Sequence, residues 1–98
     1  MTQVLIGDRA TRAARLEAAL RSLDPMRVEV TDDSHKHAGH EGARDGRGHF
    51  SVVVVSEAFR GKLPLARHRL VYAAVGSMME TDIHALAIKA LAPGEDTA

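Results

Sequence analysis

The run FSVVVV at residues 50–55 decides the fold. β-Branched residues fit the pleated surface of a sheet, and the run is too short for a typical helix. Because it is apolar almost throughout, it is expected to form a central strand that the rest of the chain covers.

A helix and a short strand are predicted ahead of this central strand. Over residues 8–23, apolar residues recur at intervals of three and four, which places them on one face of a helix. Asp8 suits the N-cap, and Asp24 followed by Pro25 ends the helix, because the residue before proline avoids helical angles. Residues 26–31 then alternate apolar and polar side chains, with the period of a half-buried strand.

A second helix and a third strand are predicted after the central strand. Pro64 suits the first turn of a helix over residues 65–79. Residues 83–91 alternate again, and Lys89 on one side predicts that the opposite side faces the core. The side expected to face the core carries His84, Leu86 and Ile88.

The connections predict how the strands pair. The segment between Thr31 and His49 holds half of the chain's eight glycines and reads as a long loop, which is often a functional element. It joins the first two strands as an antiparallel pair, and the longer helical connection allows a parallel crossover to the third. We therefore expect an α/β fold of the two-layer α+β kind with a three-stranded mixed sheet. Residues 1–92 are expected to form one domain and residues 93–98 a flexible C-terminal tail.

The composition excludes several classes of function. A chain of 98 residues is small for an enzyme that encloses a large cofactor. It contains no cysteine, so disulfides, cysteine-only zinc sites and thiol catalysis are excluded, and a metal would need His, Asp or Glu ligands. The apolar stretch near the N-terminus is too short for a signal peptide or a membrane span, so the expected location is the cytoplasm, with no membrane contact.

The histidines cluster around the predicted loop. Parallel neighbours start at the same end of a sheet, so His84 should lie where the loop rejoins the central strand. Two imidazoles that meet there could bind one metal ion, with each nitrogen about 2 Å from it. They could instead provide half of the ligands of an iron–sulfur cluster, if a partner supplied thiolates. The alternative is that the loop histidines are solvated and His84 is satisfied by a backbone group. The loop histidines that could reach His84 are His35, His37 and His40.

Several short motifs together resemble the BolA family. The resemblance covers residues 28–93 and rests most on the run from Arg67 to Tyr72 with the His84, Ala85, Leu86 motif after it. The other matching residues are Asp33, Ser34 and His37; His49 and Phe50; Val54, Val55 and Ser56; Phe59 and Gly61.

This resemblance implies a class II KH-like fold, αββααβ, with the helices on one face of the sheet. It also implies a heterodimer with a monothiol glutaredoxin and a bridging [2Fe-2S] cluster. Glutaredoxin and a bound glutathione each give one thiolate to such a cluster, and the BolA protein gives two ligands. Here these ligands would be His84 and a loop histidine, best matched by His37, with His40 and His35 as alternatives; His49 would be structural. The isolated protein is expected to carry no cofactor and to be a monomer or weak homodimer.

The predicted function is a non-enzymatic adaptor in iron–sulfur trafficking or in iron or redox sensing. No HExxH motif or credible nucleophile is present, which argues against an enzyme. The alternative is a DNA-binding transcriptional regulator, because a stretch of ten residues without an acid could neutralise phosphates or meet an acidic partner. The formal net charge of zero weakens that alternative. The positive residues of this stretch are Arg60, Lys62, Arg67 and Arg69.

Overall fold

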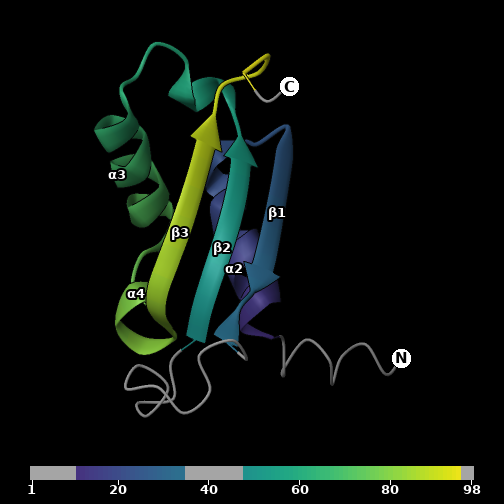
Figure 1. Ribbon diagram of the computed structural model, residues 1–98, viewed down its shortest axis with the longest axis vertical. Coiled ribbons are helices and arrows are strands. Elements are labelled where there is room, and N and C mark those ends of the chain that lie inside the picture. The colour runs from purple at the N-terminus through teal and green to yellow at the C-terminus, as the bar shows by residue number, and fades with distance from the viewer. Residues whose placement is uncertain (1–10, 35–47, 96–98) are drawn as a thin grey trace.

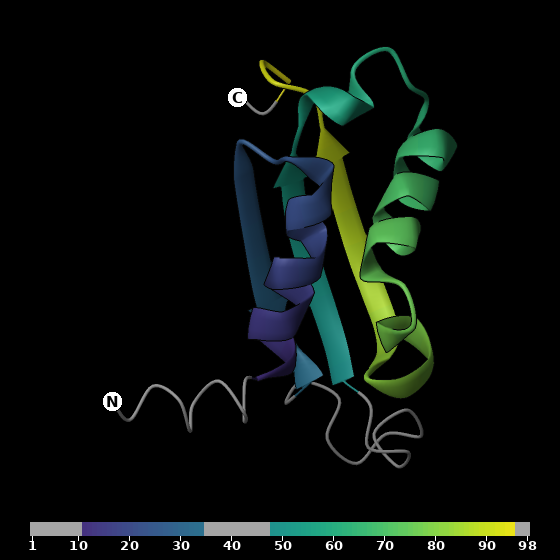
Figure 2. The ribbon, with the colours of Figure 1, turned by 180° about the vertical axis from the view of Figure 1, so that it is seen from behind.

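The computed structural model describes residues 11–34 and 48–95, so the predictions on His35, His37 and His40 lie outside the described residues. The order of helix, two strands, two helices and a strand agrees with the predicted αββααβ arrangement. Figures 1 and 2 show the elements from the front and from behind. They are α2 (Arg12–Leu20), η1 (Arg21–Leu23), β1 (Arg27–Asp32), β2 (Gly48–Val55), η4 (Glu57–Phe59), α3 (Pro64–Val75), α4 (Met78–Thr81) and β3 (Ile83–Leu91).

The three strands form one mixed sheet in the order β1-β2-β3. β1 pairs with β2 antiparallel, and β2 pairs with β3 in parallel. The run at residues 50–55 is thus the centre of the sheet, as its apolar sequence predicted. The prediction that placed His84 at the end of the loop depends on parallel pairing of the last two strands, and this pairing is confirmed.

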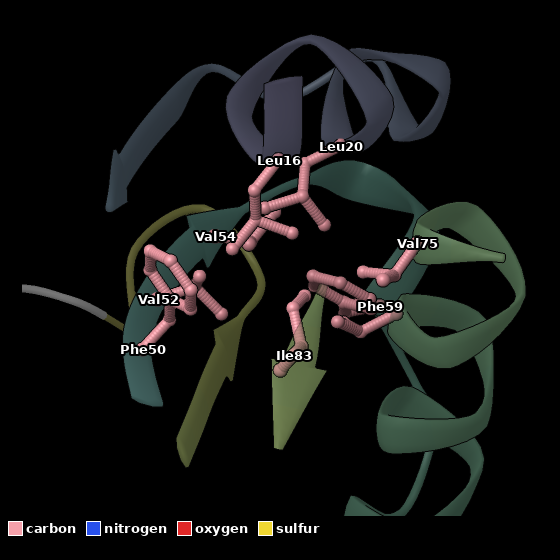
Figure 3. Close-up of a cluster of buried hydrophobic side chains, with 9 residues drawn as sticks. Leu16, Leu20, Phe50, Val52, Val54, Phe59, Val75 and Ile83 are labelled. Atoms are coloured by element: carbon pink, nitrogen blue, oxygen red, sulfur yellow. The ribbon is translucent and has the colours of Figure 1, made fainter. Parts of the chain in front are cut away.

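The core lies between one face of the sheet and the helices. Phe50, Val52 and Val54 alternate along β2 and are buried against α2 and α3. Figure 3 shows Leu16 and Leu20 of α2 pointing toward Val54. Aliphatic side chains thus form most of this core, as expected for a sequence with 3% aromatic residues.

The first helix starts later than the sequence predicted. Thr11, not Asp8, is its N-cap, because the Thr11 Oγ1 atom accepts a hydrogen bond from the Ala14 amide at 3.0 Å. Asp8 lies outside the described residues. At the other end, Asp24 takes a left-handed conformation with φ of 52°, and Pro25 follows it. The predicted end of the helix is confirmed.

The predicted helix over residues 65–79 is two helices in the structure. α3 ends at Val75 because Gly76 takes a φ of 65°, which is accessible to glycine at little cost. α4 then leads into β3. Of the helices in the described part of the chain, none is long and apolar enough to cross a membrane.

Candidate metal centre

His84 occupies an irregular position at the start of β3. Gly48 pairs with Ile83, but the next residue of β2, His49, pairs with Ala85, so His84 is an extra residue in β3. Such a bulge shifts the alternation of side chains by one position. Ile83 is therefore fully buried in the core, whereas His84 is exposed.

The prediction that His84 faces the core is wrong, and the bulge is the reason. The same prediction is confirmed for Leu86 and Ile88, which pack against the core cluster. The alternation of polar and apolar residues gives the correct face only where the pairing is regular. A bulge of one residue is not visible in that pattern.

The imidazole of His84 lies beside that of His49. Their ring centroids are 5.1 Å apart and the ring planes are inclined by 50°. His49 alternates with the buried Phe50, so its side chain lies on the sheet face opposite the core. The two strands are joined at this end by a hydrogen bond of 2.8 Å from the Gly48 amide to the Asp82 carbonyl.

The backbone of His49 is fixed by residues at the end of β1. Its amide donates to the Ser34 Oγ atom at 3.0 Å, and its carbonyl accepts from the Asp33 amide at 2.7 Å. Ser51 in turn donates to the Asp33 carboxylate at 2.5 Å. Hydrogen bonds therefore fix the His49 backbone at both its amide and its carbonyl, and the ring extends from this fixed position.

Gly48 leaves room for this arrangement. A Cβ atom at this position would lie 2.6 Å from the Phe50 ring and 2.7 Å from the Ser34 Oγ atom. Both distances are below van der Waals contact, so a side chain here would displace one of these neighbours. The close approach of Ser34 to the start of β2 requires glycine.

The turn before His84 is tied to the first helix. The Asp82 carboxylate accepts from Arg15 at 2.7 Å and from Arg12 at 3.4 Å, and Thr81 donates to its other oxygen at 2.6 Å. These hydrogen bonds, that of Arg15 foremost, lower the pKa of Asp82 below its usual value. No local sequence pattern pairs Arg12 and Arg15 with Asp82, because these contacts join residues that lie 70 and 67 positions apart.

The described residues provide histidine ligands but no complete metal site. No group of three or more His, Cys, Asp or Glu side chains able to hold a metal is found in residues 11–34 and 48–95. The exposed His84 nevertheless has a suitable donor, since a neutral imidazole ligates iron and zinc. A metal bound at His84 would need further ligands from outside the described residues or from a partner.

Two of the four cations predicted to bind DNA or a partner are held in ion pairs. Arg60 donates to Glu57 at 2.7 and 3.1 Å. Arg67 donates to Glu95 at 2.6 and 3.1 Å, and only 14% of its side chain is exposed. Its guanidinium also donates to the carbonyls of Lys62 and Ala90. The ten-residue stretch that carries the four cations does not include Glu57 or Glu95. The sequence of this stretch therefore did not predict either ion pair.

Glu95 also fixes the chain after β3. The hydrogen bond from Arg67, followed by that from the Ala92 amide, lowers the pKa of Glu95 to about 2. The sequence predicted a flexible tail from residue 93, and the structure connects Pro93 and Glu95 to Arg60 and Arg67. Residues 96–98 lie outside the described residues.

The remaining predicted cations, Lys62 and Arg69, are exposed. No ion pair joins either of them to an acid in the part of the chain that the structure describes. They flank the start and the outer face of α3, next to the exposed side chains of Leu63 and Leu65.

Known proteins share this fold and sequence. A family model described as BolA-like protein matches residues 20–95. SufE-like protein 1, chloroplastic/mitochondrial, of Arabidopsis thaliana is 40% identical over 97 residues, which cover 94% of this chain and 26% of that protein. The DNA-binding transcriptional regulator BolA of Escherichia coli (strain K12) is 39% identical over 75 residues, which cover 76% of this chain and 69% of that protein.

A solved structure, the BolA domain of SufE1 from Arabidopsis thaliana, has a TM-score of 0.75 and 38% identity and covers 88% of this chain and 96% of that one. The chain thus spans about a quarter of SufE-like protein 1 and nearly all of the solved BolA domain of SufE1. The family model covers most of the chain, from the last residue of α2 to the turn after β3. The chain therefore belongs to the BolA-like family.

Proposed function

We propose that this protein is a non-enzymatic adaptor that pairs with a monothiol glutaredoxin and co-ligates a bridging [2Fe-2S] cluster. Its role would be iron–sulfur cluster trafficking or iron and redox sensing. Membership of the BolA-like family supports this proposal. The observation that carries it is the exposed imidazole of His84, set on a β-bulge at the end of the sheet.

The donor chemistry of the chain fits a cluster that is shared. The chain has no cysteine, so it can offer imidazole nitrogens but no thiolate. Two histidines replace two cysteines on one iron of Rieske-type clusters, so a histidine pair is an adequate half of such a ligand set. The thiolates would come from glutaredoxin and its glutathione. A bound [2Fe-2S] cluster would supply one-electron redox chemistry and visible absorption.

Two ligands are assigned to this chain in the proposal. His84 is the first, and the second is one of the histidines between the first two strands, with His37 preferred over His40 and His35. The parallel pairing of β2 with β3 supports this assignment, because it brings His84 to the end of β2 that follows those residues. What the described residues contribute is position: Asp82 fixes the turn before His84, and His49 contacts its ring.

The experiment is reconstitution of the mixed complex from the full chain, a monothiol glutaredoxin, iron, sulfide and glutathione without oxygen. His84→Ala should abolish the visible circular dichroism spectrum that distinguishes the mixed complex from the glutaredoxin homodimer. His68→Ala is the matched control, because His68 lies on α3 away from this sheet end. A spectrum that His84→Ala leaves unchanged would remove His84 as a ligand and overturn the proposal.

A second candidate function is DNA binding, favoured by the similarity to the Escherichia coli regulator. The exposed cations Lys62 and Arg69 support it, because they could contact phosphates. The ion pairs of Arg60 and Arg67 weaken it, because they leave fewer charges for a nucleic acid. We therefore rank the adaptor function first.

A further inference from the structure

N–H groups from α3 and from the end of β3 converge on the carboxylate of Glu95. Arg67 donates to it from Nη1 at 2.6 Å and from Nη2 at 3.1 Å, and the Ala92 amide donates at 2.9 Å. Arg60 lies at the same turn, because its Nη2 atom donates to the Pro93 carbonyl at 3.1 Å. Figure 1 shows this turn beside η4, at the end of the sheet opposite α4. The donors form a site that suits an anion with two oxygens.

The guanidinium of Arg67 is held in place without Glu95. Its Nε atom donates to the Lys62 carbonyl at 2.8 Å and its Nη1 atom to the Ala90 carbonyl at 3.0 Å. The Arg67 side chain is 14% exposed, whereas that of Glu95 is 43% exposed. An ion pair with an exposed partner contributes little to stability, so rotation of the Glu95 side chain opens the site at small cost. The site is therefore preformed, and Glu95 is its replaceable part.

We propose that Arg67 and the Ala92 amide form a phosphate-binding site that Glu95 occupies in the isolated chain, so that the Glu95 side chain is an autoinhibitory latch. An external phosphate needs the same N–H groups as Glu95 and must displace it. The latch therefore keeps the affinity of this end of α3 for phosphates low. The inference goes beyond the adaptor function, and it adds to DNA binding, the second candidate function, where the phosphate belongs to a nucleic acid.

A phosphate is favoured over a protein carboxylate as the group that displaces Glu95. A carboxylate from another chain makes the same bonds as Glu95, which has the advantage of belonging to the same molecule. A terminal phosphate carries close to two negative charges and three acceptor oxygens, and a nucleic acid presents many phosphates in a row. The neighbouring cations can use these additional charges. Arg60 lies at the turn, and Lys62 is exposed in the segment that Arg67 contacts.

The test removes the latch and keeps the site. Glu95→Gln, made in the full chain, preserves the size of the side chain but places an amide NH2 group against the Arg67 guanidinium. Glu57→Gln is the matched control, because it causes the same change in net charge at the neighbouring Arg60. Binding of inorganic phosphate is followed by NMR at the Arg67 Nε–Hε group, and binding of a short labelled DNA duplex by fluorescence anisotropy. The amide spectrum checks that each variant is folded.

We expect Glu95→Gln to bind inorganic phosphate about fivefold more tightly than the wild type, because every molecule then has an open site. Glu57→Gln should change this affinity less than twofold. Arg67→Lys, added to Glu95→Gln, should remove the gain, since an ammonium group lacks the two parallel N–H groups of arginine. Glu95→Asp keeps the charge but shortens the side chain, so it should give a smaller gain in the same direction.

Equal phosphate affinities of Glu95→Gln and the wild type would overturn the inference. An equal gain in Glu57→Gln would also overturn it, because the effect would then be one of net charge. Acetate that binds Glu95→Gln as tightly as phosphate does would overturn the choice of phosphate.

The duplex identifies the source of the phosphate. A duplex affinity that rises with the phosphate affinity in Glu95→Gln, with a steeper salt dependence, supports the site as a contact for nucleic acid. A gain for inorganic phosphate alone supports the site with a free phosphate as its ligand, and counts against DNA binding. Neither result changes the glutaredoxin pairing, which the reconstitution experiment tests separately.

Discussion

The rings of His49 and His84 lie 5.1 Å apart, centroid to centroid, and are inclined by 50°. His49 has a regular position in β2 and a backbone held by Ser34 and Asp33, whereas His84 is the extra residue of a bulge. The ring of His84 thus packs against the ring of His49, whose backbone is fixed by hydrogen bonds. This contact predicts that His49 helps to position the ring of His84.

The first prediction is that His49→Ala frees the His84 ring. Removing the His49 imidazole takes away a packing partner of an otherwise exposed side chain, so the ring should sample more rotamers. We expect the His84 ring resonances in a proton–carbon NMR spectrum of the isolated protein to move toward values of a solvated histidine. His49→Phe, which keeps a planar ring, should restore most of the wild-type shift.

Thermal unfolding separates this effect from loss of the fold. His68→Ala serves as the control for removal of a histidine that does not contact His84. If the His84 resonances of His49→Ala match those of the wild type, the ring contact does not position His84. A His49→Phe variant that behaves like His49→Ala would contradict the role of ring packing.

The second prediction concerns Gly48. A methyl group here would lie 2.6 Å from the Phe50 ring and 2.7 Å from Ser34 Oγ, so Gly48→Ala must displace a core ring or the residue that holds His49. We expect a loss of about 1–3 kcal/mol in the free energy of unfolding, the usual cost of overpacking. Urea denaturation of the purified protein measures it.

A double-mutant cycle with Ser34→Ala tests the cause. Ser34→Ala alone removes the acceptor of the hydrogen bond that the His49 amide donates and should cost about 0.5–1.5 kcal/mol. In its background Gly48→Ala should cost less than in the wild type, because one of the two close contacts is gone. Strict additivity of the two substitutions would show that the Ser34 contact does not restrict Gly48.

Much of this architecture could be predicted from sequence because it depends on local patterns. The apolar run at residues 50–55 predicted the central strand, and Pro25 the end of the first helix. The position of His84 depends instead on a one-residue bulge, and the anchoring of Asp82 on a contact with Arg15 far away in sequence. Neither has a periodic signature, so the sequence could bring His84 to the correct end of the sheet but not give the direction of its side chain.

The third prediction concerns Asp82, whose carboxylate joins the turn before His84 to α2. Asp82→Asn keeps the shape but loses the charge that Arg15 and Arg12 bind, and should lower the free energy of unfolding at neutral pH by about 1–2 kcal/mol. The pKa of Asp82 is lowered in the folded protein, so its contribution is present above the unfolded pKa and is lost as pH falls through the folded pKa.

The pH dependence is therefore the diagnostic measurement. The stability difference between wild type and Asp82→Asn should be constant near neutrality and should shrink below about pH 4, the usual range of an aspartate pKa. Chemical denaturation at a series of pH values measures it. Glu80→Gln is the control, since Glu80 is exposed in the neighbouring helix. A difference that stays constant down to acid pH would contradict the ion pair as its source.

The fourth prediction separates the two candidate functions through the cations near α3. If DNA binds this region, replacing Lys62 and Arg69 by Gln should make the slope of log affinity against log salt less steep. The change should correspond to the loss of about one to two phosphate contacts. Arg67→Gln should instead lower stability, because its side chain is 14% exposed and donates to Glu95 and to two backbone carbonyls. Fluorescence anisotropy with a labelled duplex at several salt concentrations measures the slope, and thermal unfolding measures the stability.

Glu95→Gln provides the matched comparison, because it removes the acid that pairs with Arg67 without touching Lys62 or Arg69. If Arg67 is a structural residue, Glu95→Gln and Arg67→Gln should lower the unfolding temperature in the same direction, and neither should reduce the salt slope. A reduced slope in Arg67→Gln with unchanged stability would identify Arg67 as a phosphate contact. An unchanged slope in the Lys62 and Arg69 double variant would leave these two exposed cations available to a protein surface instead, because the electrostatic part of DNA binding depends on the charges that neutralise phosphates.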